Sequence, residues 1–248
     1  MTGFAWCADV NSFFMKEHDT LTERIILHGE NVHHMHVLRC EKGERLRICD
    51  GTGRSYLCSL TALTKGEAVL DIIEELPNEE PAAFITLFQA LPKQDKMETV
   101  IQKCVELGVS AFVPVQTEFS IGQANDKKVS RWQKISLAAA KQSRRSIIPS
   151  VAPVCGFKEA LSKMTALDAA FVAYEEERKL SAKEAFQSFG GGSIGIFIGP
   201  EGGFSPEEIR LCRQQEIPSF SLGKRILKVD TASMMAVIIL LTYREDFI

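Results

Sequence analysis

The chain has 248 residues, of which 45% are hydrophobic and 25% are charged. These values are typical of a folded globular protein that buries a sizeable core, and they exclude a disordered or fibrous chain. The formal net charge of −3 gives no bulk attraction for nucleic acid, so a polyanionic partner requires a local basic surface.

The first residues of the chain carry charges and lack the apolar run of a signal peptide. The longest apolar run, residues 234–241, is too short to span a bilayer, so we expect a cytoplasmic protein with no membrane role. Seven scattered cysteines without a Cys-x-x-Cys pair predict neither disulfides nor zinc. His33, His34, His36 and Cys40 lack the paired spacing of a metal site, so no metal is expected.

Residues 1–75 show short strand patterns separated by turn signals such as Lys42-Gly43 and Lys65-Gly66. The expected strands are residues 24–27, 45–50, 55–63 and 67–73. This spacing is typical of a small β-barrel or sandwich. A linker rich in Pro and Glu, residues 77–81, marks a domain boundary, and we expect domains at 1–75 and 76–248.

After the linker, strand patterns alternate with helical ones. The expected strands are residues 84–91, 111–115, 169–174, 193–198 and 219–222. Helices are expected around residues 97–105, 129–144, 181–188 and 231–243, and another begins at Ser205-Pro206, which has the signature of a capped start. This alternation predicts an α/β domain with a mostly parallel sheet covered on both faces.

Residues 127–145 carry seven basic side chains and no acidic one, and residues 224, 225 and 228 form a second basic cluster. The seven are Lys127, Lys128, Arg131, Lys134, Lys141, Arg144 and Arg145. A charged helix face that is merely solvated usually mixes signs, whereas a face of one sign favours a polyanionic partner.

Two loops that follow predicted strands, residues 199–204 and 222–230, are candidate ligand loops. The pair Gly202-Gly203 lets the backbone approach a ligand closely, although a plain glycine turn has the same pattern. Neither Gly-x-Gly-x-x-Gly nor a nucleotide-triphosphate loop is present, and Glu201 would repel phosphate. An uncharged or cationic ligand such as S-adenosyl-L-methionine fits better.

Several motifs occur in a characteristic order along nearly the whole chain. They are His34-Met-His-Val-Leu-Arg39 with Gly43, Lys93 and Lys96 before residues 103–108, Arg131-Trp132, Gln142-Ser-Arg-Arg145, residues 199–204 and residues 222–232. In this order they resemble the bacterial 16S ribosomal RNA uridine N3-methyltransferase (RsmE-like) family of the SPOUT superfamily. The resemblance implies a PUA-like β-barrel that recruits RNA and a SPOUT α/β domain with a deep trefoil knot.

The resemblance also implies S-adenosyl-L-methionine as cofactor, a homodimer, and methylation at N3 of a uridine in 16S rRNA, with the assembled 30S subunit as the expected substrate. The cofactor-binding residues would be Ala173, Gly199, Pro200, Glu201, Gly202, Gly203, Leu222, Gly223, Ile226, Leu227, Thr231 and Ala232. The RNA-binding residues would be His34, Arg39, Lys93, Lys96, Arg131, Gln142, Arg144, Arg145, Arg225 and Lys228.

Methyl transfer to the imide nitrogen of uracil requires alignment of the reactants and loss of the N3 proton, and it requires no metal. Arg145 is the candidate cation that stabilises the uracil anion, with a phosphate clamp as its alternative role. Glu201 and Asp230 are the candidate bases.

The chain departs from the family pattern at residues 3–6, where the family tends to have a basic residue beside aromatics, and at Phe119, where the family often has Arg. Residues 228–231 replace the family's Arg-Thr-Glu-Thr. Three other functions remain open: a SPOUT methyltransferase of transfer RNA or ribose, a non-catalytic RNA-binding assembly factor, and a nucleotide-dependent oxidoreductase. The last expects a glycine fingerprint on its first strand-helix unit, and residues 89–93 have none.

Overall fold

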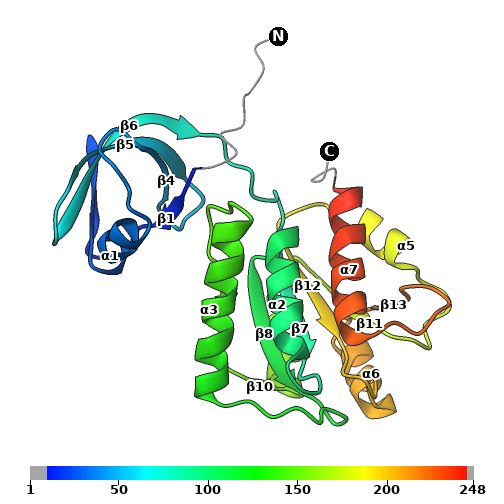
Figure 1. Ribbon diagram of the computed structural model, residues 1–248. Helices are drawn as coiled ribbons and strands as arrows, with labels where there is room; N and C mark the ends of the chain where they lie inside the picture. Colours follow the sequence, from blue (N-terminus) through cyan, green and yellow to red (C-terminus); the bar gives the residue numbers. More distant parts are fainter. Residues whose placement is uncertain (1–9, 245–248) are drawn as a thin grey trace. The chain divides into compact units, whose positions relative to one another are not determined.

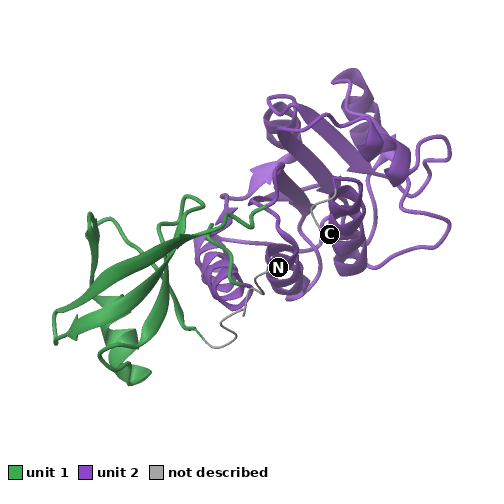
Figure 2. Ribbon diagram, turned by 90° about the horizontal axis from the view of Figure 1, so that it is seen from above, with its two compact units in different colours: residues 1–80, 144–147 green, residues 81–143, 148–248 purple. Residues whose placement is uncertain are grey.

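The computed structural model describes residues 10–244, so the departure at residues 3–6 lies outside the described residues. The chain divides into two compact units (Figures 1 and 2). Of the described residues, unit 1 contains 10–80 and 144–147, and unit 2 contains 81–143 and 148–244. The short segment 144–147 therefore belongs to the N-terminal unit although it lies within the second half of the sequence.

Unit 1 is a curled, mixed sheet of six strands in the order β1-β4-β5-β6-β3-β2 (Figure 1). The strands are β1 Ser12–Phe14, β2 Thr20–Leu21, β3 Arg24–His28, β4 Arg45–Cys49, β5 Ser55–Leu63 and β6 Glu67–Leu76. Strand β1 runs parallel to β4, the other pairs are antiparallel, and the β5–β6 register shifts at two places. Such irregularities bend a sheet, which is consistent with the PUA-like half-barrel.

A short helix, α1 (Glu30–Val37), closes this sheet by packing Val32 and Met35 into its core. Sequence reasoning predicted β3 to β6 but missed α1, β1 and β2. Helix α1 begins at Gly29 without a side-chain cap and carries three histidines, so neither a cap nor an apolar stripe marks it in the sequence.

Unit 2 contains a fully parallel sheet in the order β10-β8-β7-β12-β11-β13, with β9 beside β8. The strands are β7 Phe84–Ala90, β8 Ala111–Gln116, β9 Ser150–Val151, β10 Cys155–Gly156, β11 Ala169–Ala173, β12 Ser193–Ile198 and β13 Ser219–Phe220. The predicted α/β fold with a parallel sheet is confirmed.

In the part of the chain that the structure describes, six helices surround this sheet: α2 Lys96–Leu107, α3 Asp126–Gln142, α4 Phe157–Met164, α5 Ala182–Gln187, α6 Pro206–Gln214 and α7 Val229–Tyr243. Helix α2 lies between α3 and α7 on one face (Figure 1). On the other face, α4 and α6 pack Leu161 and Ile209 against Phe88 and Phe197. The deep trefoil knot implied by the family resemblance stays a prediction.

The ends of two helices follow directly from sequence. Helix α2 ends at Gly108, whose φ of 110° lies in the left-handed region that glycine adopts without strain. Helix α6 begins at Ser205, which forms a capping box with Glu208 and precedes Pro206. Between residues 10 and 244, no helix has the length and apolar character needed to cross a membrane.

Candidate functional site

The strand order places a topological switch point between β7 and β12. From β7 the chain moves outward to β8 and β10, and it then returns to β11 and β12 on the other side of β7. Gln89 of β7 is paired with Ile198 of β12, so the loops that follow these two strands leave the sheet next to each other. Ligands of open parallel sheets bind in the crevice that such a divergence creates.

Glu201 connects the two loops at this crevice. Its carboxylate accepts a hydrogen bond from the backbone N–H of Lys93 (3.2 Å) and forms an ion pair with Lys96 Nζ (2.6 Å). Burial alone would raise the pKa of Glu201, but the hydrogen bonds from Lys96 and from backbone N–H groups outweigh it and lower the pKa. Glu201 is therefore anionic at neutral pH, which makes it a weak base and a strong partner for Lys96.

The two glycines after Glu201 are required by neighbouring loops. A Cβ at Gly202 would lie 3.0 Å from the Cβ of Phe119, in the loop after β8. Gly203 has a φ of 71°, and a Cβ there would lie 2.3 Å from a carboxylate oxygen of Glu175, in the loop after β11. The glycine pair thus lets three loops from the carboxyl edge of the sheet meet in van der Waals contact.

An open pocket lies beside this junction, lined by Lys93, Glu118, Phe119, Ser120, Ile121, Glu201 and Gly202. Its rim is fixed by Glu208, which accepts a hydrogen bond from the backbone N–H of Glu118 (2.9 Å) and caps α6 with its other oxygen. The Phe119 and Ile121 side chains above it are 42% and 68% exposed. The pocket therefore combines apolar surface with charged groups.

The second candidate loop follows β13 and leads into α7. Ile226 is 95% exposed, and Gly223 has a φ of 117°. Asp230, in the first turn of α7, buries its Oδ1 without a hydrogen-bond partner in the described part of the chain. A buried acceptor without a partner is unfavourable, so it fits a ligand that brings a donor or a positive charge.

All twelve predicted cofactor residues lie along the carboxyl edge of the one parallel sheet. Ala173 ends β11, residues 199–203 follow β12, residues 222–227 follow β13, and Thr231 and Ala232 lie in the first turn of α7. The unpaired Asp230 oxygen and the glycine loops fit S-adenosylmethionine, which presents amino and hydroxyl donors and a sulfonium charge.

Sequence reasoning missed a buried polar pair beneath these loops. Gln89 and Ser233 are fully buried, and Ser233 Oγ donates to Gln89 Oε1 (2.7 Å). The Gln89 amide donates to the carbonyls of Ala90 (3.0 Å) and Ile198 (3.4 Å). The pair thus joins the ends of β7 and β12 to the start of α7. A single Gln in an apolar strand was the signal that could have revealed it.

A second missed residue is Glu177, in the loop after β11. Its carboxylate accepts hydrogen bonds from Ser219 Oγ (2.5 Å) and the backbone N–H of Lys179 (2.7 Å). These bonds, led by the one from Ser219, lower the pKa of Glu177 to about 2. Glu177 therefore attaches this loop to β13, beside the second candidate loop.

The predicted RNA-binding residues occur in both units. In unit 1, His34 and Arg39 are exposed on α1 and just beyond it, and the His34 ring packs edge-on against Phe13. In unit 2, Lys93, Arg131, Gln142, Arg225 and Lys228 are exposed, while Lys96 is partly buried in its pair with Glu201. Arg131 also forms an ion pair with Glu98 (2.8 Å). Three further basic residues of α3 are also exposed: Lys127, Lys128 and Lys134.

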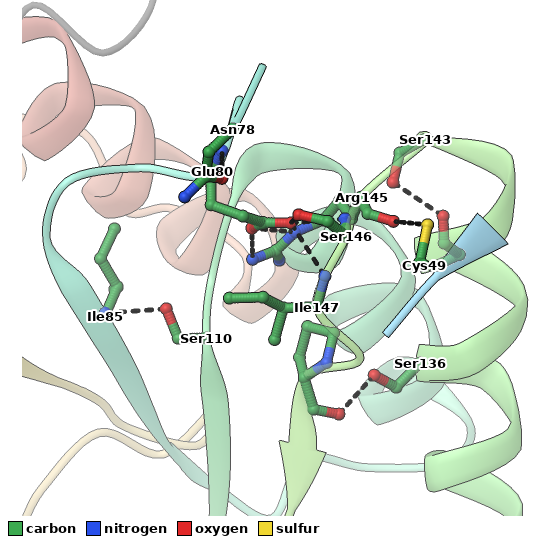
Figure 3. Close-up of polar contacts among 12 residues, drawn as sticks. Cys49, Asn78, Glu80, Ile85, Ser110, Ser136, Ser143, Arg145, Ser146 and Ile147 are labelled. Atoms are coloured by element: carbon green, nitrogen blue, oxygen red, sulfur yellow. Dashed lines mark hydrogen bonds and ion pairs between the residues drawn. The ribbon is translucent and has the colours of Figure 1, made fainter. Parts of the chain in front are cut away.

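The last two basic residues of this stretch differ from the rest. Arg144 is half-buried, and Arg145, which follows α3, is only 7% exposed. The Arg145 guanidinium donates to the Glu80 carboxylate through Nε (2.9 Å) and Nη2 (Figure 3). Glu80 also accepts hydrogen bonds from the backbone N–H groups of Ser146 (2.8 Å) and Ile147 (3.0 Å). Arg145 thus belongs to unit 1, whereas Glu201 and Asp230 lie in unit 2.

Within residues 10–244, no group of three or more His, Cys, Asp or Glu side chains is arranged to hold a metal ion. The cysteines of this range are free and buried, and burial raises the pKa of thiols such as Cys49, to about 11, and Cys212, to about 12. These thiols are packing residues rather than nucleophiles.

Comparison with known proteins agrees with both units. An RNA methyltransferase domain matches residues 78–241, and an RNA methyltransferase PUA domain matches residues 27–73. Ribosomal RNA small subunit methyltransferase E of Bacillus subtilis is 36% identical over 84% of this chain and 86% of its own length. The protein of that name from Aquifex aeolicus is 30% identical over 88% of this chain and 94% of its own length.

Solved structures give the same result. The Neisseria gonorrhoeae ribosomal RNA small subunit methyltransferase E, bound to S-adenosyl methionine, superposes with a TM-score of 0.83 at 32% identity, over 94% of this chain and 98% of that one. A Legionella pneumophila methyltransferase in complex with the same cofactor superposes with a TM-score of 0.79 at 28% identity, over 94% of this chain and 98% of that one. The chain therefore belongs to the ribosomal RNA small subunit methyltransferase E family, with a PUA domain followed by an RNA methyltransferase domain.

Proposed function

We propose that this chain uses S-adenosyl-L-methionine to methylate N3 of a uridine in 16S rRNA. Its substrate is the assembled 30S subunit, and it acts in the cytoplasm. The observation that carries the proposal is the glycine loop at the switch point of the parallel sheet. Relatives of this chain are named ribosomal RNA small subunit methyltransferase E. The exposed basic side chains of α3 support an RNA partner.

The residues at the crevice have separate roles in this proposal. S-adenosylmethionine would supply the methyl group of its sulfonium, with a neutral thioether as the leaving group. The backbone of residues 199–203 and 222–227 would hold the ligand, and the unpaired Oδ1 of Asp230 would accept a hydrogen bond from it or face its charge. The Glu201–Lys96 ion pair keeps the two loops at the crevice together.

Proton loss from N3 needs a base or a stabilising cation. The lowered pKa of Glu201 opposes proton uptake, which leaves Asp230 as the other candidate base. Arg145 remains the candidate cation, and in that role its guanidinium would have to leave Glu80.

The decisive test is nucleoside mass spectrometry after incubating the protein and S-adenosylmethionine with 30S subunits from a strain that lacks the homologous enzyme. We expect one 3-methyluridine per subunit. A methylated ribose, or methylation of transfer RNA in its place, would assign the chain to another substrate, and binding without methylation would indicate an assembly factor.

The cofactor loop is tested by calorimetry on Gly202→Val. We expect loss of S-adenosylmethionine binding with a native circular dichroism spectrum, because the added bulk enters the loop. Since a Cβ at this position also meets Phe119, the same substitution is made in a Phe119→Ala background. Unchanged affinity in both variants would place the cofactor elsewhere.

A further inference from the structure

The pocket beside Gly202 contains features that the cofactor loops do not explain. Phe119 and Ile121 expose 42% and 68% of their surface at its rim, although aromatic and branched apolar side chains are ordinarily buried. The rim is fixed by two hydrogen bonds to its backbone. Glu208 accepts one from the N–H of Glu118, and Ser120 Oγ accepts one from the N–H of Thr117. An exposed aromatic side chain on a fixed loop is suited to ring stacking.

The pocket also contains one carboxylate without a partner. The Glu118 side chain forms no hydrogen bond or ion pair within residues 10–244, whereas Glu201 is paired with Lys96. Glu118 is exposed, and because a free carboxylate only accepts hydrogen bonds, a ligand group that meets it has to be a donor. Lys93 at the edge of the pocket supplies a positive charge suited to a phosphate.

We propose that this pocket is the subsite for the acceptor base. In this subsite an unpaired uracil stacks on Phe119. The Glu118 carboxylate accepts the N3–H hydrogen bond and then the N3 proton, in place of Asp230 or Glu201, which frees the N3 electron pair to attack the methyl group. This inference rests on the proposed function and extends it to the recognition of the base. The pocket adjoins the proposed cofactor loop, as methyl transfer to a bound base requires. Gly202 belongs to both the pocket and the loop, and Phe119 Cβ lies directly against Gly202.

The proposal explains selection of uracil over cytosine. Uracil carries a proton on N3, whereas cytosine presents a bare nitrogen there, and a carboxylate opposite that nitrogen is repulsive.

The first experiment measures single-turnover methylation of 30S subunits by the full-length protein carrying Phe119→Ala, Phe119→Leu or Phe119→Trp. We expect the Ala variant to lose about 5- to 150-fold, the range for loss of one stacked base. The Leu variant should also lose activity because it keeps apolar bulk without a ring, and the Trp variant should retain most of it. Phe84→Ala, which removes a 50% exposed ring at the opposite end of β7, is the matched control and should behave as wild type.

The second experiment replaces Glu118 by Ala, with the exposed Glu23→Ala as control. We expect a loss of at least tenfold for Glu118→Ala, consistent with removal of a hydrogen bond to a charged group. Calorimetry must show unchanged S-adenosylmethionine affinity in every variant, since the subsite is separate from the cofactor.

The outcomes separate this inference from the function itself. An inactive wild-type protein would overturn the proposed function. If the wild type is active and Phe119→Ala methylates as fast as Phe84→Ala, the stacking subsite is overturned while the methyltransferase function stands. The same holds if Phe119→Leu methylates as fast as Phe119→Trp. Parallel loss of cofactor affinity in Phe119→Ala would assign the ring to the cofactor site.

Discussion

At the scale of single residues, Arg145 shows how strongly burial changes the role expected of a cation. A guanidinium in a basic stretch predicts contact with RNA, yet this one is paired with Glu80, and both side chains are only 6% exposed. Glu80 also accepts hydrogen bonds from the backbone N–H groups of residues 146 and 147. This arrangement favours a positioning role for Arg145, in which it fixes the segment 144–147 within unit 1.

The two roles predict different results for Arg145→Ala. If the residue stabilises the uracil anion, single-turnover methylation should fall about a hundredfold while cofactor affinity and thermal stability stay near wild type. If it positions the segment, unfolding free energy should fall by about 3 kcal/mol, because one charge is left buried without its partner.

Glu80→Ala separates the two roles further. A positioning pair predicts that both single variants and the double variant lose similar stability, as measured by urea denaturation. A catalytic Arg145 predicts that Glu80→Ala retains methylation. Stable protein with full activity in both single variants would contradict both roles.

The residues show where prediction from sequence succeeds. Gly199 to Gly203 and residues 222–232 could be placed at strand ends because apolar runs bounded by glycine mark those ends locally. The Arg145–Glu80 pair could not be predicted, since its partners are 65 residues apart and a charge pattern does not reveal burial. The same holds for Phe119, whose contact with Gly202 joins two separate loops.

At the scale of elements, the Gln89–Ser233 pair connects three of them. It joins the end of β7 and the end of β12, where the first candidate loop begins, to the start of α7, where the second candidate loop ends. Ser233→Ala leaves Gln89 Oε1 buried without a donor, so we expect a loss of about 1–3 kcal/mol in unfolding free energy. We also expect weaker S-adenosylmethionine binding, because both loops lose their common anchor.

The double variant Gln89→Leu/Ser233→Ala distinguishes positioning from simple stability. Replacing both polar partners by apolar groups should recover most of the stability, while cofactor affinity stays reduced in calorimetry. Ser136→Ala is the control, since Ser136 is equally buried on α3 and donates to Pro149. If affinity recovers together with stability, the pair has no positioning role.

The long elements of unit 2 could be predicted from the sequence, whereas several of the short ones could not. Strands β7, β8 and β12 were placed within about a residue, because buried parallel strands give uninterrupted apolar runs. Strands β9 and β10 were missed because they have two residues each, too few for a period. Strand β13 is equally short, but it lies within the strand predicted at residues 219–222. Helix α4 was missed because its eight residues begin at Gly156 without a side-chain cap.

At the scale of the whole molecule, α7 leaves apolar surface that unit 2 does not cover. The helix packs against α2, α5 and β12, yet Ile238 is 42% exposed, and Met234, Met235 and Ile239 are only partly buried. We expect this stripe to form a homodimer interface. Sedimentation equilibrium should find a dimer for wild type and for Val37→Glu, a control in unit 1, and a monomer for Ile238→Glu. A wild-type monomer with full activity at micromolar concentration would contradict the dimer.

The final prediction is that unit 1 recruits RNA, and that without it the C-terminal domain binds cofactor but methylates little. A fragment of residues 81–248 would leave Arg145 without Glu80, so surface substitutions in the full chain test recruitment more cleanly. His34 and Arg39 are exposed beside the apolar Val37 and Leu38, which suits contact with an unpaired RNA segment.

We expect the double variant His34→Ala/Arg39→Ala to bind S-adenosylmethionine normally and to lose about tenfold in tritium transfer to 30S subunits, with weaker RNA binding. Arg45→Ala, another exposed cation of unit 1, is the control. Because folded ribosomal RNA is needed to present the target base, naked 16S rRNA should be a poorer substrate than 30S subunits for every variant. Equal transfer by the double variant and wild type would locate recruitment outside this surface, and α3 of unit 2 would then be the principal RNA contact.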